Sequence, residues 1–207
     1  KDETIVKSLL TDYDATEGQT RINSFDLYIV SSESTFKLNE CVITTGDFNL
    51  SKGSATTLAV SGQAQQLQRV GNASYSLPGS LVSASSTRTP TLSLIDVEVS
   101  GSDVSNIVSA TLSVQNEIAW TPFETLQSSL SVTNATNAMY PSSFTLGRRV
   151  VSGSIIQYIT NNNSSTVQTF NADTTVRLKT VVDGSTFLDA NLANCMFTKR
   201  SETADVF

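Results

Sequence analysis

The sequence predicts an all-β protein: an antiparallel β-sandwich of two sheets, with long loops and at most one or two short helices. Its 207 residues include 31 Ser and 27 Thr; Thr favours strands, and Ser favours turns. Apolar and polar residues alternate over several short stretches, as in Ser24–Val30 and Leu92–Val99, and this is the period of a half-buried strand. Clusters of Gly, Pro, Asn and Ser separate these stretches, as turns do.

The first 21 residues are predicted to form an N-terminal arm, ahead of a single domain at residues 22–207. Five apolar residues recur there at helical spacing, which predicts one short amphipathic helix or an arm that docks on a neighbour: Ile5, Val6, Leu9, Leu10 and Tyr13. The acidic stretch Asp12–Gly18 is predicted to be a loop.

Residues 22–70 are predicted to be a series of strands. In the first strand, Phe25, Leu27 and Ile29 share one face. A turn at Ser31–Ser34 leads to a strand at Phe36–Thr45, and Gly46 indicates a turn at Thr45–Asp47. Two further strands, at Phe48–Leu50 and Thr56–Gln68, complete the series.

Residues 71–91 are the best candidate for a long loop, because turn-forming residues are concentrated there. A loop of this length inside a compact domain is often functional or packed against a partner. The residues singled out within it are Leu77, Pro78, Arg88 and Pro90. A plain surface loop is the alternative.

Strands are predicted to resume at residue 92. In Leu92–Val99, Val97 and Val99 share one face and Asp96 and Glu98 share the other, which makes that sheet face acidic. Val108–Gln115 alternates in the same way, with Leu112 and Val114 inward. Trp120–Phe123 is an aromatic cluster that either docks a partner or packs in the core.

The stretch Met139–Thr160 is predicted to contain an entry strand, a turn and a long strand. Gly147 indicates the turn, with Arg148 and Arg149 on it. The residues from Val150 onward are mostly β-branched or aromatic, which favours an extended strand. Because both faces of this strand are apolar, we expect a core on one side and a neighbouring layer or subunit on the other.

The C-terminal third holds another alternating strand, Val176–Val182, which is basic on one face and ends at a tight turn, Asp183–Gly184. Phe187–Lys199 is ambiguous. Leu188, Leu192 and Met196 fit a helix, whereas a resemblance to the stretch around Cys41 favours a strand. Such echoes indicate a weak internal duplication near residues 24–70 and 110–198, although chance explains them equally well.

Composition argues against several functional classes. The net charge is −6 and no basic patch is visible, which disfavours a sequence-specific nucleic-acid reader. The chain has no histidine and no recognisable catalytic or metal-binding motif, so we predict no enzyme, no cofactor and no metal. Cys41 and Cys195 are predicted to be buried free thiols, with a disulfide between them as the alternative in an oxidising compartment. No apolar run is long enough to cross a bilayer.

One pattern resembles a known family. The residues Phe144-x-Leu146-Gly147-Arg148-Arg149-x-x-x-Gly153-x-Ile155, with the upstream strand Leu112–Glu117, are similar to a segment of the tail tube proteins of long-tailed bacteriophages. The resemblance covers about residues 108–182.

This resemblance implies a structural virion protein without enzymatic activity. Copies would form rings, hexameric as in the family, that stack around a lumen through which DNA passes without specific binding. Partners would be the chain itself and the tip, terminator and sheath proteins of the tail, with assembly in the host cytoplasm. The residues assigned by this reading are Asp96 and Glu98 at the lumen, Gly147, Arg148, Arg149 and Gly153 at subunit contacts, and Leu77, Pro78, Arg88 and Pro90 between rings.

Two rival functions stay open. The first is a tail tip or hub ring protein with a tube-like domain. The second is a β-sandwich adhesin or carbohydrate-binding module, which would be expected to carry a stripe of exposed aromatic residues on one sheet face.

Overall fold

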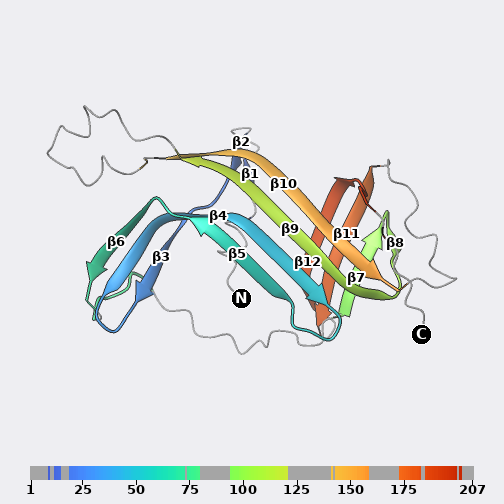
Figure 1. Cartoon of the computed structure of the whole chain (residues 1–207), viewed down its shortest axis with the longest axis horizontal. Helices are drawn as coiled ribbons and strands as arrows, with labels where there is room; N and C mark the ends of the chain where they lie inside the picture. Colours follow the sequence, from blue (N-terminus) through green and yellow to red (C-terminus); the bar gives the residue numbers. More distant parts are fainter. Residues whose placement is uncertain are drawn as a thin grey trace. The chain divides into compact units, whose positions relative to one another are not determined.

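The computed structural model confirms the all-β class with two main antiparallel sheets (Figure 1). It describes residues 9, 12–14, 19–72, 74–79, 94–120, 141, 143–158, 173–182, 185–199 and 201. Within these residues lie twelve strands: β1 (Asp12–Asp14), β2 (Gln19–Arg21), β3 (Phe25–Val30), β4 (Thr35–Ser51), β5 (Thr57–Gln63), β6 (Gln66–Gly71), β7 (Leu94–Val99), β8 (Ser102–Asp103), β9 (Ile107–Trp120), β10 (Phe144–Gln157), β11 (Thr174–Val182) and β12 (Ser185–Cys195).

The chain forms two compact units. The first contains Lys1–Asp47, Leu58–Arg88 and Ser113–Ser152, and the second contains Phe48–Thr57, Thr89–Leu112 and Gly153–Phe207. The single-domain hypothesis for residues 22–207 and the weak internal duplication stay predictions.

The larger sheet has six strands in the order β10-β9-β4-β3, with β5 and β6 also paired to β4 (Figure 1). Strand β4 reaches all of them because it is 17 residues long. Its first part, Thr35–Cys41, pairs with β3, and Thr35–Asn39 also pairs with β6 on the other side. Four strands, β10, β9, β4 and β5, therefore lie side by side over the remaining length.

Two predicted turns in this sheet are wrong. Gly46 lies inside β4 and Gly147 lies inside β10, so neither Thr45–Asp47 nor Gly147–Arg149 reverses the chain. Glycine in a strand interior often marks a close approach by another group. That is the case here, because a Cβ on Gly147 would lie 3.2 Å from the side chain of Glu117, and one on Gly46 would overlap the side chain of Leu9.

The second sheet has four strands in the order β12-β11-β7-β8. The residues from Ser185 to Cys195 are strand β12, so the helical alternative for this stretch is wrong. The chain turns after β7 at Ser100–Gly101, both with positive φ, and continues into β8 at Ser102 and Asp103.

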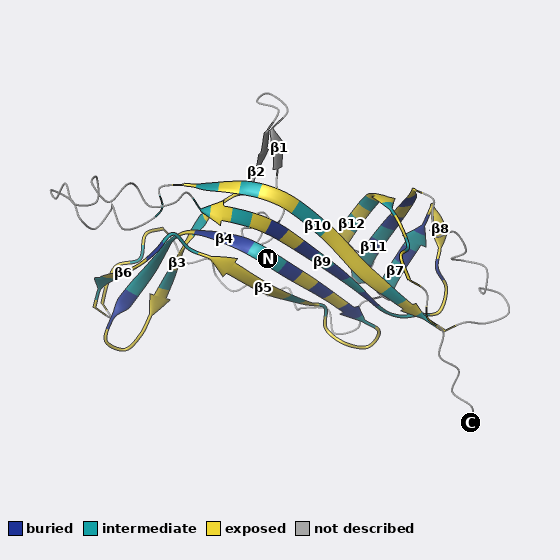
Figure 2. Ribbon diagram, turned by 45° about the horizontal axis from the view of Figure 1, so that its top comes forward, coloured by how far each residue is buried: buried dark blue, intermediate teal, exposed yellow. Residues whose placement is uncertain are grey.

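Burial alternates along β7, β9 and β11, as predicted, whereas Cys41, Val42 and Ile43 of β4 are buried in succession (Figure 2). In the second unit, the buried residues come from both sheets: Phe48, Leu50, Val97, Val99, Val104, Ala110, Leu112, Val176 and Leu178. In the first unit, they include Leu9, Ile22, Cys41, Val42, Ile43 and Val114. Burial raises the pKa of the Cys41 thiol. Both cysteines are free as predicted, but Cys195 is only half-buried.

Near the N-terminus, Asp12–Asp14 pairs antiparallel with Gln19–Arg21. Strand β1 therefore replaces the first part of the predicted loop. Leu9 has helical backbone geometry and is fully buried; the other four residues of the predicted helical pattern either lie outside the described residues or, for Tyr13, belong to β1. Among the described residues, no helix is long and apolar enough to cross a membrane.

Candidate functional site

The four-stranded part of the larger sheet, β10-β9-β4-β5, ends in two edge strands. Within the part of the chain that the structure describes, β10 pairs only with β9, and β5 pairs only with β4. Both carry exposed apolar side chains: Val60 on β5 is 40% exposed, and Val151 and Ile156 on β10 are 44% and 55% exposed. The sequence predicted that β10 is covered on both faces. The described residues do not cover both of its faces, so a covering subunit stays a prediction.

The residues of the resemblance motif from Phe144 to Ile155 lie on edge strand β10, and its upstream stretch Leu112–Glu117 lies on β9. Gly153 faces β9 so closely that a Cβ would overlap the carbonyl oxygen of Thr111. The exposed Arg148 donates its backbone N–H to the Glu117 carboxylate at 3.4 Å. The glycines of this motif thus keep β10 close to β9, and the predicted subunit contacts of the motif stay predictions.

Arg149 is placed differently from Arg148. Its side chain turns into its own unit, where Nε donates to Asn116 Oδ1 and Nη2 donates to the Leu9 carbonyl, both at 2.8 Å. Burial lowers the pKa of Arg149. The sequence analysis placed this residue on a turn and at a subunit contact, and nothing local in the sequence pointed to Leu9 or Asn116.

The exposed face of the four-stranded sheet carries a cluster of five charges. The strand register sets Glu98 opposite Arg177 and Asp96 opposite Lys179, and Asp189 on β12 lies opposite Lys179. Lys179 Nζ binds Glu98 and lies 3.6 Å from Asp96. Arg177 binds Asp189 through two hydrogen bonds, of 2.8 and 2.7 Å.

These contacts shift the pKa values in the direction expected for ion pairs. The hydrogen bond from Lys179 lowers the pKa of Glu98, and that from Arg177 lowers the pKa of Asp189. Oxygens of Asp96, Glu98 and Asp103 lie within 4.8 Å of one another, a spacing that could suit a metal ion. The Lys179 ammonium already contacts two of these carboxylates. The arrangement is therefore a partly neutralised ion-pair ladder rather than the purely acidic wall predicted for Asp96 and Glu98.

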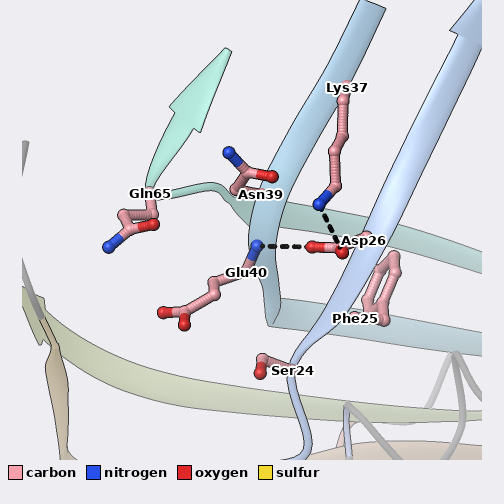
Figure 3. A pocket seen from close by; sticks show the side chains of 7 residues that line it. All are labelled: Ser24, Phe25, Asp26, Lys37, Asn39, Glu40 and Gln65. Atoms are coloured by element: carbon pink, nitrogen blue, oxygen red, sulfur yellow. Dashed lines mark hydrogen bonds and ion pairs between the residues drawn. The ribbon is translucent and has the colours of Figure 1, made fainter. Parts of the chain in front are cut away.

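A shallow cavity of about 510 Å³ lies where β4 changes partners (Figure 3). The register shifts there, since Phe25 pairs with Cys41 while Leu27 pairs with Leu38, and this is a β-bulge. Asp26 accepts the Glu40 N–H at 3.1 Å and pairs with Lys37 at 2.7 Å, and this lysine lowers the pKa of Asp26. The lining residues are Ser24, Phe25, Asp26, Lys37, Asn39, Glu40 and Gln65. Their polar groups hold the bulge, which indicates a structural role.

Glu40 in this bulge has a φ of 46°, in the left-handed region that favours glycine. We expect Glu40→Gly to raise the free energy of unfolding by roughly 0.5–1 kcal/mol, because relief of the left-handed conformation exceeds the entropy that glycine costs. Urea denaturation measures the change. Glu40→Ala is the matched control, since it keeps the Cβ; an equal gain in both variants would contradict the strained conformation.

An apolar face lies on the three-stranded part of the same sheet, formed by β3, the start of β4, and β6. Leu27, Leu38 and Leu67 form one row across these strands, and Ile29, Phe36 and Arg69 form the next. Leu27, Ile29 and Leu67 are 44%, 47% and 57% exposed. Exposed apolar patches mark surfaces that contact other proteins.

The predicted inter-ring loop is described only in part. Leu77 is half-buried and Pro78 is exposed, while Arg88 and Pro90 lie outside the described residues. Nearby, the ring of Tyr75 stacks on that of Tyr28 with centroids 6.4 Å apart, which holds this segment against β3.

Comparison with known proteins gives one family. The profile described as the Bacteriophage Baseplate Tube Protein Family matches residues 11–207. No curated protein matches the chain.

Proposed function

This chain belongs to the bacteriophage baseplate tube protein family, and we propose that its copies close into rings that stack into a tube for phage DNA. Family membership gives a structural component of the phage tail and baseplate, whose partners are other tail or baseplate proteins. The ring, its stacking and DNA passage are our proposal, as are hexameric symmetry and assembly in the host cytoplasm.

The ring proposal rests on two edge strands, β10 and β5, which lie on opposite sides of one sheet in the described part of the chain. Strands β10 and β5 flank β9 and β4, so each copy presents one edge to either side. Pairing β10 of one copy with β5 of the next is a head-to-tail contact, and such contacts form rings when the rotation closes. Closure also removes the exposed edges that otherwise invite aggregation.

Two acidic surfaces are candidates for the wall of the lumen. The first is the Asp96 and Glu98 face predicted from the sequence, whose charge is partly balanced by Lys179 and Arg177. The second lies on the ring-forming sheet, where exposed Asp47 and Glu117 point away from the buried face. Ring closure through β5 and β10 favours the second surface. Negative walls of either kind repel phosphate and let DNA slide.

Stacking of rings is assigned to the apolar face of β3, β4 and β6, together with the adjacent segment at Leu77 and Pro78. The exposure of Leu27, Ile29 and Leu67 supports this assignment, because a stacked ring would cover them. Arg88 and Pro90 keep their predicted inter-ring role as part of the proposal. The terminator, tip and sheath proteins are the further partners proposed for the ends and outside of the tube.

The baseplate named in the family description favours the rival position predicted from the sequence, at the tail tip or hub rather than along the shaft. In that case the ring would be the same, but only the distal end of the tail would contain it. Gold-labelled antibodies against the chain distinguish the two positions on intact virions, by labelling either the distal end alone or the whole tail.

Negative-stain electron microscopy of the purified chain at increasing concentration tests the ring itself. We expect rings or hollow tubes with a central channel. A chain that stays monomeric at every concentration, and that also fails to add to isolated tail ends, would overturn the proposal and favour the β-sandwich binding module.

A further inference from the structure

The side chain of Leu9 fills the space beside Gly46 in the middle of β4, a space that we call the Leu9 seat. This side chain is fully buried. A Cβ on Gly46 would overlap Leu9 Cδ2 and would lie 3.0 Å from Cδ1, so the leucine fills the space that a side chain at position 46 would need. Val42, on the same side of β4, is also fully buried, and the seat is therefore apolar.

The backbone of Leu9 is held as firmly as its side chain. Leu9 has helical geometry, but Tyr13, whose N–H would pair with the Leu9 carbonyl in a continuing helix, belongs to strand β1. Such a carbonyl needs another donor. Two are present, since Asn116 Nδ2 and Arg149 Nη2 each donate to it at 2.8 Å. A cationic side chain is favourable at this end of a helix.

Three adjacent strands contribute to this seat. Gly46 is on β4, Asn116 is on β9 and Arg149 is on β10. Asn116 also donates to the Ile43 carbonyl of β4 at 3.2 Å and accepts from Arg149 Nε. The buried Asn116 and the partly buried Arg149 therefore find their hydrogen bonds in one network centred on Leu9. Arg149 is a charge partly removed from water, and such a group is costly without partners.

We infer that Leu9 is a lock that holds edge strand β10 against β9 and β4, by filling the seat at Gly46 and satisfying Arg149 and Asn116. Truncation of the leucine side chain leaves a cavity over β4, so the backbone carbonyl of residue 9 is no longer held in place to accept from the Arg149 guanidinium. The edge strand then loses its tether to the buried face of the sheet. This inference does not depend on ring formation, since every contact lies within one chain.

A double-mutant cycle with amide hydrogen exchange tests the lock in the full-length chain. We expect Leu9→Ala and Gly46→Ala each to raise exchange in β10 at least tenfold and to leave β11 unchanged. In the Leu9→Ala background, Gly46→Ala should add less than a twofold increase, because the colliding Cδ2 atom is gone. Leu9→Met, of similar volume, should restore most of the protection.

Two results would overturn the inference. One is an equal rise in β10 exchange when Gly46→Ala is made in the wild type and in Leu9→Ala. This would mean that glycine is needed at position 46 for the strand itself and not for the Leu9 side chain. The other is an unchanged exchange rate in β10 for Leu9→Ala. If Gly46→Ala fails to fold, Arg149→Met replaces it: this change removes both arginine hydrogen bonds but keeps the seat, and unchanged exchange in β10 would count against the lock.

Discussion

We expect proline in edge strand β10 to prevent ring and tube formation at the wild-type assembly concentration, at one of two adjacent positions, Val151 or Ser152, while the monomer stays folded. Along an edge strand, successive N–H groups point alternately to the paired neighbour and to the open edge. Proline at the outward position removes a donor that the next copy needs and places its ring in the contact, at a cost of roughly 1–3 kcal/mol. Since 1.4 kcal/mol is tenfold, the concentration needed for assembly rises roughly 5- to 100-fold.

The pair of variants contains its own comparison. Proline at the inward position should break a hydrogen bond to β9 and lower the melting temperature of the monomer. Loss of assembly and loss of monomer stability are therefore expected in different variants. Val151→Ala and Ser152→Ala keep the N–H groups and should assemble at close to the wild-type concentration. Electron microscopy and sedimentation measure assembly, and thermal unfolding reports on the monomer. Tubes from both proline variants at the wild-type concentration would exclude β10 as the ring contact.

Strand faces could be predicted from the sequence because a period of two decides them locally. Val97 and Val99 are buried, Asp96 and Glu98 point the other way, and Leu112 is buried, all as the alternation indicated. The all-β class followed from the same pattern. Neither result needed knowledge of which strands pair.

The two wrong turns have a common physical cause. Gly46 and Gly147 each predicted a turn, because a glycine between two predicted strands most often marks a turn. Each is glycine because a distant residue needs the space, Leu9 for Gly46 and Glu117 for Gly147. A contact between residues far apart in the chain leaves no local pattern, so a sequence window cannot separate this use of glycine from a turn.

In the ion-pair ladder of the four-stranded sheet, the strand register decides which charged residues lie opposite each other. Alternating carboxylates in β7 and alternating cations in β11 were both visible as strand faces. Only the pairing of β7 with β11 sets Glu98 opposite Arg177 and Asp96 opposite Lys179, which balances part of the predicted acidic wall. Arg149 escaped prediction for the same reason, because its partners come from an N-terminal residue and from β9.

The largest loss of monomer stability is expected from Leu178→Ala. Leu178 is 2% exposed and lies on β11, between β12 and β7. Truncation of a buried leucine removes apolar contacts and leaves a cavity, which costs about 2–5 kcal/mol. A typical domain is stable by only about 5–15 kcal/mol, so this is a large fraction of the whole. Urea denaturation followed by far-ultraviolet circular dichroism measures the change.

The neighbouring Arg177 is the matched control, because it lies on the same strand but on the opposite face. Its side chain is 38% exposed, and exposed ion pairs contribute at most about 1 kcal/mol. Arg177→Ala should therefore cost far less than Leu178→Ala, even though it removes two hydrogen bonds to Asp189 and the pairing with Glu98. Equal costs for the two variants would mean that the ion-pair ladder, and not the apolar face beneath it, holds the four-stranded sheet together.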